Sequence, residues 1–83
     1  MRKIVMCAHA DTVGTDTKEL IGFPDTVTSK ELDEYAQEFG QAHWESYDSS
    51  SNEEEYHEYI EACDSWWEEY NEEEHSWMEV QKP

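Results

Sequence analysis

The sequence predicts a small α+β domain, in which an antiparallel sheet of two or three strands packs with two helices in the order β-β-α-α. Three observations support this class: two short β-prone apolar segments near the N-terminus, a helix-capping motif before an amphipathic pattern, and a second segment with helical spacing. At 83 residues the chain is expected to form one domain, residues 1–83, with a thin core.

The first predicted elements are two strands that pair as a hairpin. In "KIVMCAHA", residues 3–10, alternate apolar side chains share each face of a strand. The polar run "DTVGTD", residues 11–16, contains Gly14 and predicts the connecting turn. "TKELIGF", residues 17–23, predicts the second strand, which ends at Pro24 because proline cannot donate to the ladder.

A helix is predicted after the hairpin. "TSKE", Thr28 to Glu31, is a capping box, with a hydroxyl at the N-cap and a carboxylate three residues later. Behind it the apolar residues fall at i, i+3, i+4 and i+7, which is one face of a helix: Leu32, Tyr35, Ala36 and Phe39. We expect this helix to continue past Gly40 to His43 or Trp44.

A second, acidic helix is predicted to start at Glu53, after the loop "DSSSN" at residues 48–52. Helical spacing connects the apolar residues that follow, with acids at most other positions: Tyr56, Tyr59, Ile60, Cys63, Trp66 or Trp67, and Tyr70. "HSWMEVQ", residues 75–81, either ends this helix or forms a last strand that joins the hairpin. We favour the strand.

The charge balance limits the partners that this protein can meet. The chain has 22 acidic residues against 5 Lys and Arg, for a net charge of −17, and 13% aromatic residues argue against an acidic disordered tail. Residues 1–40 carry eight acids and four bases, whereas residues 41–83 carry fourteen acids and one base. Nucleic acids and anionic membranes would be repelled, whereas a basic protein surface would be attracted.

Cysteine usage and hydropathy predict a soluble protein of the cytoplasm. Cys7 and Cys63 form no CxxC motif, and the N-terminus has neither a long apolar region nor a cleavage site of a signal peptide. No apolar run reaches the length of a transmembrane helix. We therefore expect two reduced thiols and no membrane partner.

The first half of the chain also resembles a family of small acidic proteins encoded by bacteriophages. The stretch "VGTDTKELIGFPDTVTSKELDEYAQEF" carries the resemblance, through a Gly-Thr-Asp turn, a Phe-Pro-Asp motif and a Thr-capped acidic helix. The matching residues are Val13, Gly14, Asp16, Glu19, Phe23, Pro24, Asp25, Thr28, Glu31 and Leu32. The resemblance implies a phage setting, the host cytoplasm, a compact α+β fold and no catalytic residues. The segment after Trp44 departs from the family pattern.

The acidic segment supplies the candidate partner-binding residues. Eleven acids lie between Glu53 and Glu74, and one helix of 22 residues would span about 33 Å. This gives roughly one carboxylate per 3 Å, close to the ~3.4 Å phosphate repeat of a DNA strand, and predicts a DNA-mimicking surface. The alternative is a merely solvated helix face. The predicted contact residues are Glu53, Glu54, Glu58, Glu61, Asp64, Trp66, Trp67, Glu68, Glu69, Glu72 and Glu73.

The adjacent tryptophans add an anchor to this hypothesis. On a helix, Trp66 and Trp67 would point about 100° apart, so one would join the core while the other, with Tyr59 or Trp77, stays accessible. An exposed Trp ringed by acids is suited to hold a partner that the acids steer. The alternative is that all tryptophans pack in the core, and the sequence leaves open which one is exposed.

Metal binding, cofactors and catalysis are not predicted. "DSSSNEE" resembles a calcium loop at alternate positions, but Glu53 and Tyr59 stand where that loop needs Gly and Glu. Cys63 with His57 or His43 could form a nucleophile pair, yet acidic neighbours raise the pKa of a thiol and oppose its reactivity. We therefore expect no enzyme.

The function predicted from these features is inhibition by binding. Acids would cover the basic surface of a host nucleic-acid-binding defence protein, such as a CRISPR effector or a restriction enzyme, which would make this an anti-CRISPR or anti-restriction protein. The alternative is an acidic interaction module for a basic non-defence partner, such as a nucleoid protein or a polymerase subunit. A homodimer stays open as well, because a thin domain gains core by pairing.

Overall fold

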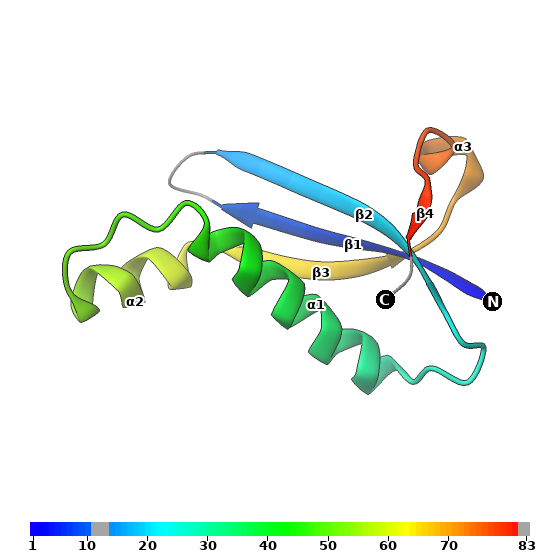
Figure 1. Cartoon of the computed structure of the whole chain (residues 1–83), viewed down its shortest axis with the longest axis horizontal. Helices are drawn as coiled ribbons and strands as arrows, with labels where there is room; N and C mark the ends of the chain where they lie inside the picture. Colours follow the sequence, from blue (N-terminus) through cyan, green and yellow to red (C-terminus); the bar gives the residue numbers. More distant parts are fainter. Residues whose placement is uncertain (11–13, 82–83) are drawn as a thin grey trace.

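The computed structural model describes residues 1–10 and 14–81. In chain order, its elements are β1 (Arg2–Ala10), β2 (Thr15–Phe23), α1 (Ser29–Glu45), α2 (Glu53–Glu61), β3 (Asp64–Glu69), α3 (Glu72–His75) and β4 (Val80–Gln81). The described strands form one sheet in the order β3-β1-β2-β4, and α1 lies along one face of it (Figure 1). The predicted α+β class is confirmed, although the sheet is larger than predicted.

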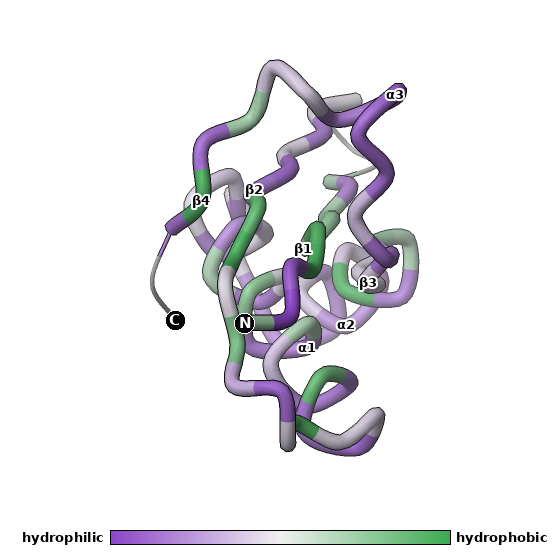
Figure 2. Tube along the Cα trace, turned by 90° about the vertical axis from the view of Figure 1, so that its right-hand side faces the viewer, coloured by the Kyte–Doolittle hydropathy of each residue, from purple (hydrophilic) through white to green (hydrophobic). Residues whose placement is uncertain are grey.

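The predicted hairpin is confirmed. β1 and β2 pair antiparallel over their full length, from Arg2 opposite Phe23 to Ala10 opposite Thr15. The turn predicted at residues 11–16 lies partly outside the described residues, but Gly14 has φ 64°, in the left-handed region that glycine adopts without steric cost. The apolar positions gather along β1 and β2 (Figure 2).

The predicted capping box starts α1. The backbone N–H of Glu31 donates to the Thr28 hydroxyl at 3.2 Å, and the backbone N–H of Thr28 donates to the Glu31 carboxylate at 3.2 Å. The helix passes Gly40 and ends at Glu45, close to the predicted end. Its apolar stripe covers one face of the sheet, with these buried members of the joint cluster: Ile4, Met6, Ile21, Phe23, Leu32 and Ala36.

The second predicted helix is wrong beyond Glu61. α2 ends there, and residues 64–69 form β3, which pairs antiparallel with β1 from Ile4 opposite Glu69 to His9 opposite Asp64. The physical reason is tertiary: β1 is buried along most of its length, so the backbone N–H and C=O groups at both of its edges need partners, and adjacent aromatic residues suit a strand. Successive side chains of a strand point to opposite faces, so Trp66 and Trp67 lie about 180° apart rather than 100°.

The C-terminal segment covers the sheet face opposite α1. There Val5, Cys7 and Leu20 form a second apolar cluster, and Tyr70 and Met78 pack against it. The strand predicted at residues 75–81 is confirmed only at Val80–Gln81, which pairs parallel with β2; His75 instead closes the short helix α3. Across residues 1–10 and 14–81, no helix has the length and apolar character needed to cross a membrane.

Candidate functional site

The predicted partner-binding acids lie on three elements rather than on one helix. Glu53, Glu54, Glu58 and Glu61 lie on α2, Asp64, Glu68 and Glu69 on β3, and Glu72 and Glu73 on α3. α2 has nine residues and spans about 13 Å. The predicted 33 Å row of carboxylates is therefore wrong, because the chain turns into the sheet after Glu61.

α2 is capped at its N-terminus and attached to the end of α1, and its acids stay exposed. The Asn52 side chain caps the helix by accepting from the backbone N–H of Glu55 at 2.9 Å. The Ser51 backbone N–H and hydroxyl donate to the Glu55 carboxylate and lower its pKa. The buried Tyr59 hydroxyl donates to the Trp44 carbonyl at 2.7 Å and fastens α2 to α1. Acids in a first helical turn are also favoured by the helix dipole.

A longer acidic surface arises because α1 carries as many acids as α2. We call it the helical acidic surface, and all its ten members are exposed: Glu31, Asp33, Glu34, Glu38 and Glu45 on α1, with Glu53, Glu54, Glu55, Glu58 and Glu61 on α2. The two helices follow one another along the long axis of the molecule, which measures 42 Å (Figure 1). The α1 acids were not among the predicted contact residues, although they lie among the polar positions of the amphipathic pattern of that helix.

Two of the predicted contact acids are engaged within the molecule. The Glu68 carboxylate lies 3.7 Å from the Cys7 sulfur, 3.8 Å from His75 Nε2 and 3.9 Å from Lys18 Nζ. Burial and the Glu68 carboxylate together raise the pKa of Cys7 to about 12, so its thiol stays protonated at neutral pH. Glu69 forms an ion pair with Arg2. Both acids therefore help to fasten β3 and the C-terminal segment to the hairpin.

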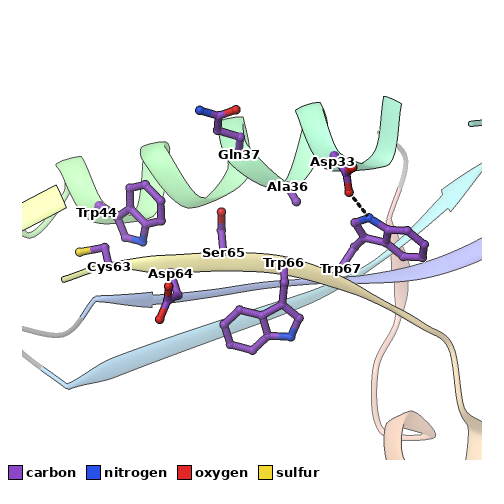
Figure 3. A pocket seen from close by; sticks show the side chains of 9 residues that line it. All are labelled: Asp33, Ala36, Gln37, Trp44, Cys63, Asp64, Ser65, Trp66 and Trp67. Atoms are coloured by element: carbon purple, nitrogen blue, oxygen red, sulfur yellow. Dashed lines mark hydrogen bonds between the residues drawn. The ribbon is translucent and has the colours of Figure 1, made fainter. Parts of the chain in front are cut away.

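The structure answers which of the paired tryptophans is exposed. Trp66 points away from α1 and is 40% exposed (Figure 3). Trp67 turns toward α1, where its indole N–H donates to the Asp33 carboxylate at 2.7 Å and the Arg2 guanidinium lies 5.7 Å from the ring centre. Trp77, in the loop after α3, is 71% exposed. The alternative that every tryptophan packs in the core is therefore wrong.

A groove runs between α1 and the outer edge of β3. Its volume is about 620 Å³, and we call it the edge groove (Figure 3). The lining residues are Asp33, Ala36, Gln37, Trp44, Cys63, Asp64, Ser65, Trp66 and Trp67. The buried indole N–H of Trp44 has no hydrogen-bond partner among the described residues. No sequence signal predicted this groove, because it exists only once β3 is a strand.

The residues considered for metal binding or catalysis take part in local contacts. The Ser50 hydroxyl donates to the Asp48 carboxylate, as does the Ser50 backbone N–H at 2.9 Å, and both hydrogen bonds lower the Asp48 pKa. The Cys63 thiol lies 3.2 Å from the Tyr59 carbonyl, whereas His57 lies 3.6 Å from Glu53. Within residues 1–10 and 14–81, no three His, Cys, Asp or Glu side chains converge as a metal site. That this chain is not an enzyme stays a prediction.

Comparisons with known proteins found no family model, no curated protein and no solved structure that matches this chain. The resemblance to small acidic phage proteins therefore stays a prediction. Of the residues that carry it, Val13 lies outside the described residues, while Thr28 and Glu31 form the capping box.

Proposed function

We propose that this protein is a phage-type inhibitor that binds the nucleic-acid-binding surface of a host defence protein, such as a CRISPR effector or a restriction enzyme. The observation that carries the proposal is the helical acidic surface, with ten exposed carboxylates along two consecutive helices of a molecule with net charge −17. The host cytoplasm is the corresponding location. The acidic surface replaces the single acidic helix that the sequence suggested.

The dimensions of the molecule suit a partner that normally holds nucleic acid. The whole molecule is 42 Å long, which corresponds to about 12 phosphates of one strand at ~3.4 Å each and is the upper limit for the length of its acidic surface. A basic channel that binds DNA or RNA presents Lys and Arg over such a length, and fixed carboxylates would displace its counterions as phosphates do. Opposite charge also speeds the encounter of the two proteins and makes it sensitive to salt.

The test is capture from a bacterial lysate with the tagged full chain as bait, washed at low and then high salt, and repeated with competing DNA. We expect retention of one DNA- or RNA-binding protein that is released by salt and by DNA. Its identity separates a defence protein from the alternative partners, a nucleoid protein or a polymerase subunit. Scattered basic proteins that come down only at low salt would contradict the proposal.

Two charge-reversal variants then locate the surface on the captured protein. The helical variant carries Glu34→Lys, Glu38→Lys, Glu54→Lys and Glu58→Lys. The control variant carries Glu72→Lys, Glu73→Lys, Glu74→Lys and Glu79→Lys, on exposed residues of the C-terminal segment around α3, at the end of the molecule opposite α2 (Figure 1). Glu72 and Glu73 are predicted contact residues that lie outside the helical acidic surface, so this variant also tests them. Four reversals of two charges each change the net charge from −17 to −9 in both variants. Only the helical variant should lose binding, and equal losses would refute a specific acidic surface.

A further inference from the structure

β3 has an outer edge that no other described strand covers. It is the end strand of the sheet, in which β1 alone pairs with it. The backbone N–H of Tyr70 donates to the Lys3 carbonyl at 3.2 Å and continues the same ladder. Hydrogen-bonded pairs alternate along an antiparallel ladder, so the N–H and C=O groups of Ser65, Trp67 and Glu69 point outward. The edge thus offers three backbone donors and three acceptors.

Of the usual devices that prevent strand pairing, this edge has charged side chains but neither proline nor a bulge. β3 has no proline and no lysine, and its register with β1 runs without a bulge from Asp64 to Glu69. It carries acids instead: Asp64, Glu68 and Glu69. In an antiparallel pair of two β3 strands these acids would approach those of the second copy, and each molecule already carries a net charge of −17. The charge therefore disfavours a second copy and favours a basic strand.

On both faces of the sheet, the side chains next to this edge can bind Lys or Arg. A strand beside β3 would direct alternate side chains into the edge groove, toward Asp33 and the ring of Trp67. A carboxylate accepts several hydrogen bonds, so Asp33 can accept from Trp67 and from a cation together. The other side chains would meet Asp64 and the exposed ring of Trp66, and a cation over an indole is favourable. Arg2 already makes this contact with Trp67.

We propose that the outer edge of β3 takes up an extended, Lys- or Arg-rich segment of the partner, which pairs with it as an additional strand. Backbone hydrogen bonds would hold the segment, and its charges and spacing would select it. The proposal rests on the proposed function only in that the partner is basic. It adds that the partner contributes an extended segment, and that acids on the helices steer while the strand edge binds.

The experiment uses the full chain and a synthetic hexapeptide, acetyl-Lys-Val-Lys-Val-Lys-Val-amide. Its matched control has the same side chains but two successive central amides N-methylated, so that either edge of the peptide lacks a donor. We expect the unmethylated peptide to bind at least tenfold more tightly, by titration of the protein's tryptophan fluorescence, to which the exposed Trp66 at this edge contributes. Equal affinity would show that charge alone drives binding and would overturn the proposal.

Amide hydrogen exchange measured by NMR identifies the edge directly. The peptide should slow exchange at Ser65, Trp67 and Glu69, and leave Asp64 and Trp66 unchanged because their N–H groups already pair with β1. Slowed exchange at α1 or α2 without these three amides would overturn the proposal. The same slowing without peptide, rising with protein concentration, would assign the edge to a second copy and would also overturn it.

The strand proposal and the proposed function can fail independently of each other. If the captured partner loses affinity for the helical variant yet leaves the three edge amides unprotected, the strand proposal fails while the proposed function stands. If the peptide protects the edge but no nucleic-acid-binding protein is captured, the proposed function fails while the strand site stands. Asp64→Lys, matched against Glu79→Lys, should weaken peptide binding about tenfold. An equal effect of both substitutions would contradict recognition at the edge.

Discussion

Gly40→Ala should destabilise the protein, although alanine is the better helix former. Gly40 is buried in the middle of α1, where a Cβ would lie 2.4 Å from the Ser65 Cβ and 2.8 Å from Trp44 Cζ2. The Ser65 Cβ is fixed to the backbone of β3, so the helix and the strand must move apart. Overpacking of this kind costs about 1–3 kcal/mol, whereas the gain in helix propensity is about 1 kcal/mol.

The expected net loss is therefore about 0–2 kcal/mol of the free energy of unfolding, with a central value of about 1 kcal/mol. Urea denaturation followed by Trp fluorescence measures it, as a fall in the midpoint of about 1 M for a slope near 1 kcal/mol/M. The exposed position Ala42 provides the control, because Ala42→Gly should cost about 1 kcal/mol through propensity alone.

A double variant isolates the contact that causes the loss. Ser65→Gly removes the Cβ that meets the new methyl group, so Gly40→Ala should cost less in that background, while the Trp44 contact remains. A Gly40→Ala protein that is more stable than the parent would refute the close approach of α1 to β3, and with it the shape of the edge groove.

The remaining predictions concern the supports of the helices and the buried thiol. Tyr59→Phe removes the hydroxyl that donates to the Trp44 carbonyl and should cost about 1–2 kcal/mol in the same urea assay, with exposed Tyr47→Phe as a near-neutral control. Thr28→Ala removes the N-cap of α1 and should cost about 1 kcal/mol, whereas Thr28→Ser keeps a capping hydroxyl and should lose little stability. Because the pKa of the Cys7 thiol is raised in the folded protein, the thiol of the unfolded chain loses its proton at a lower pH than the thiol of the folded chain. The protonated thiol therefore contributes fully to stability below pH 9, and this contribution should fall as the pH rises toward about 12. Cys7→Ala should flatten that fall in urea midpoints measured at successive pH values.

The sequence predicted the elements whose signals are local. The hairpin followed from alternation and a glycine turn, and α1 followed from the Thr28–Glu31 box and four apolar residues at helical spacing. Each of these signals lies within the residues that form the element. The start of α2 at Glu53 was predicted as well, from the polar loop at residues 48–52, and in the structure the Asn52 side chain caps the helix there.

β3 could not be predicted in this way, because its signal is not local. Six residues with acids and two tryptophans fit a helix as well as a strand, and periodicity cannot separate the two over so short a run. The deciding feature is β1, which pairs with β2 along one edge. Its other edge is free to pair with residues 64–69. The edge groove and the exposure of Trp66 follow from that pairing, so they were missed together with it.

The strand also explains how acids and tryptophans share one short segment. Alternation sends Trp67 beneath α1 and Trp66 outward, while Glu68 and Glu69 meet Lys18 and Arg2, two of the five Lys and Arg residues of the chain. Few cations remain for the acids of the two helices, whose mutual repulsion opposes folding. A basic partner would relieve this repulsion. Added salt should therefore stabilise the free protein and weaken its complex, because screening removes repulsion within the fold and attraction across the interface.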